Sequence, residues 1–229
     1  MTNINIIANF EREINKIDDA VNKPATEDSL FWLNQAISKF TKLRFNGDFV
    51  HRTGYEETEK RREDLISLFK STSLTVTKQQ VEHPNYDKYV VTYPSDLLFV
   101  LDENVVISDN NNNYKLSTCV FECTRDSFMY RIDNSLTDFH YRYHRARPLR
   151  IRHDEGCDLL TDKNYKISSY TLGYLRKPTE LTLDVPQDEY PDFNDHIMYE
   201  IIKMAAQMYI ENQSDERYKT ITNEVMTQE

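Results

Sequence analysis

The chain has 229 residues, 39% of them hydrophobic, and carries a formal net charge of -10. This composition is that of a folded protein, and the negative charge disfavours a free DNA-binding protein, because phosphates are repelled except at a locally basic patch. Three cysteines without framework spacing predict free thiols in a reducing compartment. With no leader pattern and no apolar run near the ~20 residues of a membrane span, we expect a soluble, unprocessed protein.

Two helices are predicted at the start of the chain. Apolar residues at alternating steps of three and four predict the first helix over about 3–21. The second is predicted over about 26–45, where Thr26 can cap free backbone N–H groups and acidic residues follow at the positive end of the helix dipole. Its apolar stripe consists of Leu30, Leu33, Ile37 and Phe40.

A third helix is predicted over about 56–70, where acidic residues precede basic ones and apolar residues follow. The sequence then changes character, because segments rich in β-branched and aromatic residues alternate with turn residues. These segments predict an antiparallel β-rich region over about 72–184. Its strands are expected at 74–77, 89–93, 97–107, 115–124, 149–152, 165–176 and 179–184.

A last helix is predicted over about 192–213, with Asp192 as its N-cap and an acidic tail at 214–229. Its broad apolar stripe and the small residues Ala205 and Ala206 fit burial inside one core and burial between subunits equally well. The predicted fold is therefore one α+β domain over 1–229, with a helical bundle core into which the β-rich region is inserted.

The sharpest charged cluster lies at 140–153, where arginines are interleaved with tyrosines. Arginines for phosphates and tyrosines for base stacking are what a nucleic-acid patch requires. Both residue types are also enriched at protein interfaces, and these arginines could pair with a neighbour's carboxylates, so we favour an interface over DNA. The arginines are Arg142, Arg145, Arg147, Arg150 and Arg152.

Catalytic and metal-binding patterns find little support. Cys119 and Cys123 fall on a predicted strand, where four residues span ~13 Å, too far for one zinc ion without a turn. No glycine belongs to a phosphate-binding loop and no serine to a nucleophile elbow, so we predict no enzyme, no metal and no cofactor. The remaining candidates considered were Cys157, His140 and His144 for a metal, and Asp102, Glu103, Glu122 and Asp126 for a nuclease.

Several short segments, and the order in which they follow one another along the chain, carry a family resemblance. The chain resembles the ring, or head-to-tail connector, proteins of crAss-like tailed bacteriophages of gut Bacteroidales hosts. The similarity extends roughly over 26–212, and the segment at Tyr174 together with the last helix is its most distinctive part. The segments are Arg61–Ile66, Tyr93–Phe99, Arg145–Ile151, Tyr174–Pro178 and Asp192–Glu211.

The resemblance implies an adaptor-like protein without catalytic activity that closes into a ring, typically a dodecamer. Such a ring would lie in the virion neck, between the portal protein and the neighbouring tail rings, after assembly in the host cytoplasm. It would surround the channel through which DNA passes without sequence-specific binding, and the acidic surface would keep that DNA from adhering. No membrane partner is implied.

Two groups of residues are predicted to serve such a ring. The arginines at 142–152 would meet a neighbouring subunit or the portal. Core and inter-subunit contacts would come from Tyr174, Leu175, Arg176, Lys177, Ile197, Ile201, Met204 and Met208. The alternative is a phage DNA-binding or packaging-accessory module that uses the basic patch at 140–153, and a third reading is a metal-dependent nuclease.

Overall fold

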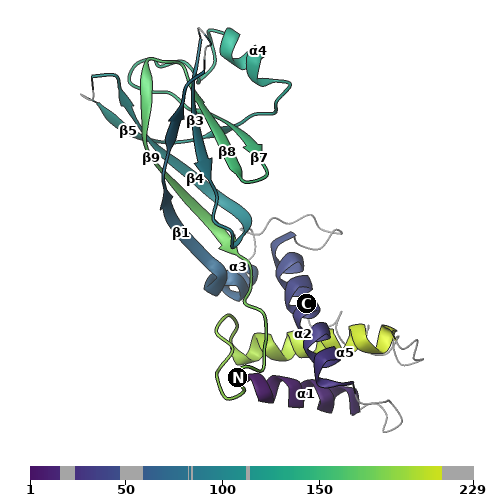
Figure 1. Ribbon diagram of the computed structural model, residues 1–229. Coiled ribbons are helices and arrows are strands. Elements are labelled where there is room, and N and C mark those ends of the chain that lie inside the picture. The colour runs from purple at the N-terminus through teal and green to yellow at the C-terminus, as the bar shows by residue number, and fades with distance from the viewer. Residues whose placement is uncertain (16–23, 47–58, 82, 84, 112–113, 213–229) are drawn as a thin grey trace. The chain divides into compact units, whose positions relative to one another are not determined.

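The computed structural model describes residues 1–15, 24–46, 59–81, 83, 85–111 and 114–212. The chain divides into two compact units, one mainly of helices and one mainly of strands (Figure 1). A helical unit comprises Met1–Leu68 and Pro178–Glu229, and a sheet unit comprises Phe69–Lys177. Parts of the predicted first and third helices, at 16–21 and 56–58, and all of the predicted tail at 214–229 lie outside the described residues.

The helical unit is organised around the last helix, α5 (Asp195–Asn212), which packs against both α1 (Asn3–Asn15) and α2 (Thr26–Asn46). A short helix, α3 (Glu59–Leu65), and a 3₁₀ turn (Ile66–Leu68) complete it. Ala205 is fully buried and Ala206 nearly so, which permits close approach of the neighbouring helices. The ring of Tyr209 on α5 meets those of Phe10 and Trp32 edge-on, at 6.2 and 6.3 Å between centroids.

A buried ion-pair network joins three of these helices. The Arg44 guanidinium on α2 lies 3.0 Å from a carboxylate oxygen of Asp64 on α3 and 2.6 Å from one of Glu200 on α5. Burial raises the pKa of Asp64, against the lowering effect of Arg44. Removing Arg44 would leave the buried Asp64 carboxylate without its cation, so this pair helps to fix the arrangement of α2 and α3.

The segment 177–194, which leads into α5, differs from its prediction. A strand was expected at 179–184, but the backbone there is irregular. Its polar groups bond to side chains instead: the Leu181 N–H donates to Asn34 at 2.8 Å and the Asn34 amide donates back at 3.1 Å. The Asp192 carboxylate, expected to cap α5, accepts the Thr179 N–H at 2.5 Å, and α5 begins three residues later.

The sheet unit consists of two β-sheets and one short helix, α4 (Phe128–Asp133). One sheet has the order β1-β9-β4-β5 and the other β2-β3-β8-β7-β6. All pairs are antiparallel except β6 with β7. The strands are β1 (Phe69–Leu74), β2 (Thr77–Gln79), β3 (Asp87–Thr92), β4 (Leu97–Asp109), β5 (Lys115–Cys119), β6 (Phe121–Glu122), β7 (Leu149–His153), β8 (Gly156–Thr161) and β9 (Tyr165–Arg176).

Alternate residues of both sheets form one hydrophobic core. It includes Val91 of β3, Val105 of β4, Leu159 of β8 and Tyr170 of β9, each with at most a trace of exposed surface. A second, smaller cluster packs on the other side of the five-stranded sheet, where Ile132 of α4 is buried. Strand β8 therefore has apolar contacts on both of its faces.

The prediction of a helical bundle core was wrong. The chain is α+β, but two β-sheets dominate it, and the described residues contain only five α-helices. The physical reason is that the strands bury their own apolar residues against each other, so the β-rich region is not an extension supported by helices. No helix among the described residues has the length and apolar content that a bilayer span requires.

Candidate interaction site

The basic segment begins with a tight turn. The N–H of Arg142 donates to the carbonyl of Arg145 at 3.0 Å, and the N–H of Arg145 donates back at 2.8 Å. The two central residues, Tyr143 and His144, have φ of 49° and 61°. Both lie in the left-handed region that two-residue hairpin turns use, which costs an L-residue with a side chain about 1–2 kcal/mol. We call residues 142–147 the arginine turn.

Neighbouring side chains hold this turn in place. Tyr141 shares a hydrogen bond of 3.2 Å between its hydroxyl and Nδ1 of His144. The His144 ring also lies against that of Tyr114, with 4.6 Å between ring centroids. The backbone N–H of Arg147 donates to the carbonyl of Asp138 at 2.8 Å. Several independent contacts thus hold the turn in its strained conformation, as is typical of functional loops.

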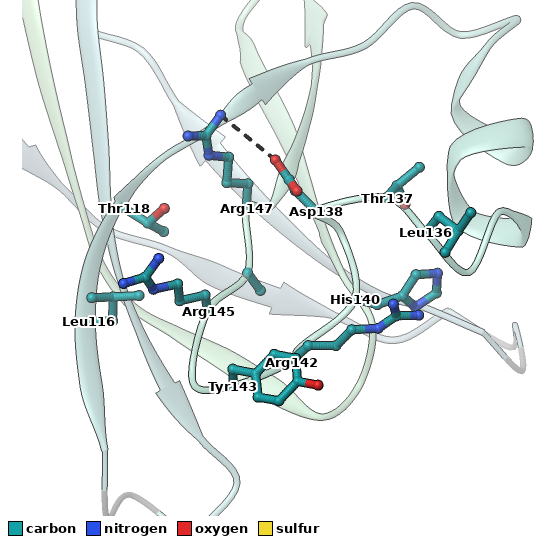
Figure 2. A pocket seen from close by; sticks show the side chains of 11 residues that line it. Leu116, Thr118, Leu136, Thr137, Asp138, His140, Arg142, Tyr143, Arg145 and Arg147 are labelled. Carbon is teal, nitrogen blue, oxygen red and sulfur yellow. Dashed lines mark ion pairs between the residues drawn. The ribbon is translucent and has the colours of Figure 1, made fainter.

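A cleft of about 560 Å³ opens beside the arginine turn. Figure 2 shows Arg145 near Leu116 and Thr118 of β5, while Arg142 extends toward His140. The turn tip exposes Tyr143, a residue that is 95% accessible, and Leu136 at the cleft wall is 83% accessible. Arginine, tyrosine and an apolar side chain on one surface are typical of protein interfaces.

The cleft carries an excess of positive charge. Its one carboxylate, Asp138, lies 3.8 Å from Arg147, and both side chains are mostly exposed. The Arg142 guanidinium donates a hydrogen bond to the backbone carbonyl of Ser135. That acceptor is uncharged, so this contact does not neutralise the positive charge of Arg142. No carboxylate of the described residues lies within ion-pair distance of Arg145. Exposed pairs are worth little in water, so these arginines remain available to a partner.

Arg150, also predicted to serve an interface, is placed inside the sheet unit. Its side chain is 7% exposed, and its guanidinium pairs with Glu103 of β4 and lies 2.8 Å from a carboxylate oxygen of the exposed Glu122. The hydroxyls of Tyr93 and Tyr170 both donate to the same Glu103 oxygen, and burial raises the pKa of each. Arg150 therefore has little surface with which to reach a second subunit.

Arg152 occupies the same face of β7 but stays exposed. Its guanidinium lies 5.8 Å from the centre of the Tyr93 ring, which is within cation–π range. Of the five predicted arginines, the structure thus brings Arg142, Arg145 and Arg147 together at one cleft and places the other two on a strand.

A comparison with protein families decides the class of protein. A family model described as phage tail ring protein 3/4 matches residues 1–194. The chain belongs to this family of crAss-like phage ring proteins. No curated protein matches it. The resemblance inferred from the sequence is confirmed, although the match includes α1 and ends just before α5, the helix on which that resemblance partly depended.

This ring protein is a structural component of a phage virion that assembles as an oligomeric ring in the tail. The residues predicted at the end of β9 are divided between core and surface. Tyr174 and Leu175 are buried, and the Tyr174 hydroxyl donates to Asp96 at 3.0 Å. Arg176 is half-buried and Lys177 is exposed, so these two remain candidates for contacts beyond the subunit.

The predicted face of α5 is likewise divided. Ile197 and Ile201 are buried in the helical unit, whereas Met204 and Met208 are half-buried. Burying an isoleucine side chain contributes about 1.5–3 kcal/mol, so the two isoleucines account for part of the unit's own stability. The methionines, which adapt to irregular surfaces, leave some area for another subunit.

The candidate metal and nuclease residues do not converge. Among the described residues, no group of three or more His, Cys, Asp or Glu side chains is placed to hold a metal ion. Glu103 and Glu122 both face Arg150, and His144 interacts with tyrosines. The Cys157 thiol is buried, and its pKa is raised to about 11 by that burial.

The sequence indicated Tyr143 as one of the tyrosines interleaved with the arginines, but it did not indicate Leu136 as an exposed apolar residue of the site. Leu136 is a single apolar residue within a polar segment, and such residues are usually unremarkable on a protein surface. A usable signal was the His140–Ala146 stretch, which lacks glycine and asparagine although it separates two apolar segments. The two-residue turn that forms there places the ordinary side chains of Tyr143 and His144 in the left-handed region.

Proposed function

We propose that this ring protein forms a closed ring in the head-to-tail connector of the virion. The ring docks on the portal protein and surrounds the channel through which DNA passes, with twelve copies as the expected number. The family match over residues 1–194 carries the proposal, because ring assembly in the tail follows from it. The net charge of -10 supports a channel lining that DNA does not adhere to.

A closed ring requires a heterologous contact, in which two different surfaces of the same chain meet. The exposed arginine turn supports the presence of one such surface. The half-buried methionines of α5 and the exposed Lys177 are further contact candidates, toward either the next subunit or the portal. The buried Tyr174, Leu175, Ile197 and Ile201 would support these contacts from inside the subunit.

The test is assembly with the portal protein of the same phage. Mass photometry and negative-stain imaging would be applied to the chain alone and to the mixture. A ring stacked coaxially on the portal is the expected result, whether or not the chain closes by itself. If neither preparation contains rings at any concentration, the proposal fails.

A second candidate function is a DNA-binding or packaging-accessory module, which the arginines beside the exposed Tyr143 favour. Phosphate contacts lose affinity steeply as salt rises. Tight binding of double-stranded DNA at 50 mM salt that disappears at 200 mM, together with no portal binding, would favour this function over the ring connector.

A further inference from the structure

A second charged surface lies on the helical unit. The connection from Thr179 to Asn194 contains no lysine, arginine or histidine. Four of its carboxylate residues are exposed, and Val185, a residue that is 52% accessible, lies among them in the sequence. We call residues 180–189 the acidic segment. Its exposed carboxylates are Glu180, Asp184, Asp188 and Glu189.

The backbone of the acidic segment is held from both sides. The first residues of the chain run along it, where the N–H groups of Asn3 and Ile4 donate to the carbonyls of Asp188 and Pro186, each at 3.0 Å. Leu181 is anchored to α2 through Asn34. An irregular segment fixed in this way presents its carboxylates with little conformational entropy left to lose on binding.

The arginine turn is the complementary surface. It presents three arginines near one carboxylate, with Tyr143 at its tip, and its backbone is likewise fixed. The acidic segment presents four carboxylates around Val185. Opposite charges around a small apolar centre match the usual anatomy of an interface, which has a polar rim and a desolvated middle.

We propose that the arginine turn of one subunit docks on the acidic segment of the next copy of the same chain. This inference rests on the proposed ring, and it names the two surfaces that close it. The two surfaces differ and lie on different units of the chain. When a subunit gives its arginine turn to one neighbour and its acidic segment to another, the growing oligomer keeps one free surface of each kind until the ring closes.

Charge reversal tests the contact in two variants. Variant A carries Arg145→Glu and Arg147→Glu, and variant B carries Asp184→Lys and Asp188→Lys. In either variant alone, like charges face each other at every contact, which is expected to weaken each contact at least about a hundredfold. Ring assembly would be measured by mass photometry and negative-stain imaging, under the conditions in which the wild-type chain assembles.

The mixture of the two variants is the decisive sample. In alternating order, the glutamates of A face the lysines of B, and the arginines of B face the native carboxylates of A. Mixing A with B is therefore expected to restore rings with an even number of subunits. Rescue in the mixture requires a contact between different chains, because a contact within one chain would stay broken in both variants.

Matched controls change the same number of charges elsewhere. They are Arg62→Glu with Arg125→Glu, and Glu63→Lys with Glu211→Lys, all at exposed positions. Both control variants are expected to form rings like the wild type. Circular dichroism of A and B would show that each is folded.

The outcomes separate the inference from the proposed function. If the wild type forms rings and A or B does so equally well, or if folded A and B do not rescue each other, the docking proposal is overturned while the ring remains. If the wild type forms no ring either alone or with the portal, both are overturned.

Discussion

Replacing Glu103 with glutamine tests how the buried arginine is held in the sheet unit. The side chains of Glu103 and Arg150 are each 7% exposed, so both charges have left bulk water. Glutamine keeps the size and the acceptor oxygen for Tyr93 and Tyr170 but removes the charge opposite Arg150. Breaking a buried pair by removing one partner costs about 3–5 kcal/mol.

The remaining partner of Arg150 reduces that cost only slightly. Glu122 lies 2.8 Å from the guanidinium, but it is 74% exposed and its attraction is screened by water. We therefore expect Glu103→Gln to lower the free energy of unfolding by about 3 kcal/mol, a large share of the ~5–15 kcal/mol typical of a domain.

Urea unfolding followed by circular dichroism measures this loss, and hydrogen exchange of the β4 and β9 amides locates it. The matched control is Glu122→Gln, which is expected to cost less than about 1 kcal/mol because that side chain is exposed. Adding Arg150→Met to Glu103→Gln is expected to recover stability, because the uncompensated buried charge is then gone. The reasoning is refuted if Glu103→Gln is no more costly than Glu122→Gln.

Three further predictions concern single residues. Gly156→Ala is expected to cost about 1–3 kcal/mol in urea unfolding, because a Cβ would lie 1.9 Å from the backbone oxygen of Val91. The Lys70 hydrogen bond lowers the pKa of Asp96 below 3.8, so its stabilising effect is complete above that pH and is lost as pH falls through the folded-state pKa. The Cys157 thiol, with its pKa raised to about 11 by burial, should react with a thiol reagent at pH 8 only after unfolding.

Each of these has a control in the same chain. An added Cβ at Gly173 would meet the side chain of Asp102, which can rotate away, so Gly173→Ala should cost less than Gly156→Ala. Asp96→Asn should flatten the acid limb of the stability profile, and an unchanged limb would contradict the assignment. The exposed Cys119 should react fast in the folded protein, and equal rates for it and Cys157 would contradict the burial.

The sequence patterns located many of the helices and strands, but they did not show which other elements pack against them. The strands expected at 97–107 and 165–176 correspond to β4 and β9, because their β-branched and aromatic content is continuous. The pairing of Val105 with Tyr170, however, joins residues far apart in the sequence. Helical periodicity indicates an apolar face without saying what buries it, which is why the helical core was overestimated and the sheet core missed.

The interpretation of the arginines shows the same limit. In β7, Arg150 lies on the opposite face of the strand from the apolar residues Leu149 and Ile151. A strand that alternates in this way normally exposes its charged face to solvent. In the structure Leu149 and Ile151 pack in the second cluster, and Arg150 on the opposite face is buried because it pairs with Glu103 of β4. The partner that makes this burial possible, Glu103, lies on another strand, and nothing in the local pattern of either residue indicates the other.

The most direct test of the neck-ring proposal is cryo-electron microscopy of the neck in intact virions of the same phage. The expected result is a rotationally symmetric layer next to the portal, with the sheet unit fitted into each repeat and arginine turns in contact with neighbouring copies. A neck without this chain, with its density found in another part of the tail, would contradict the connector position.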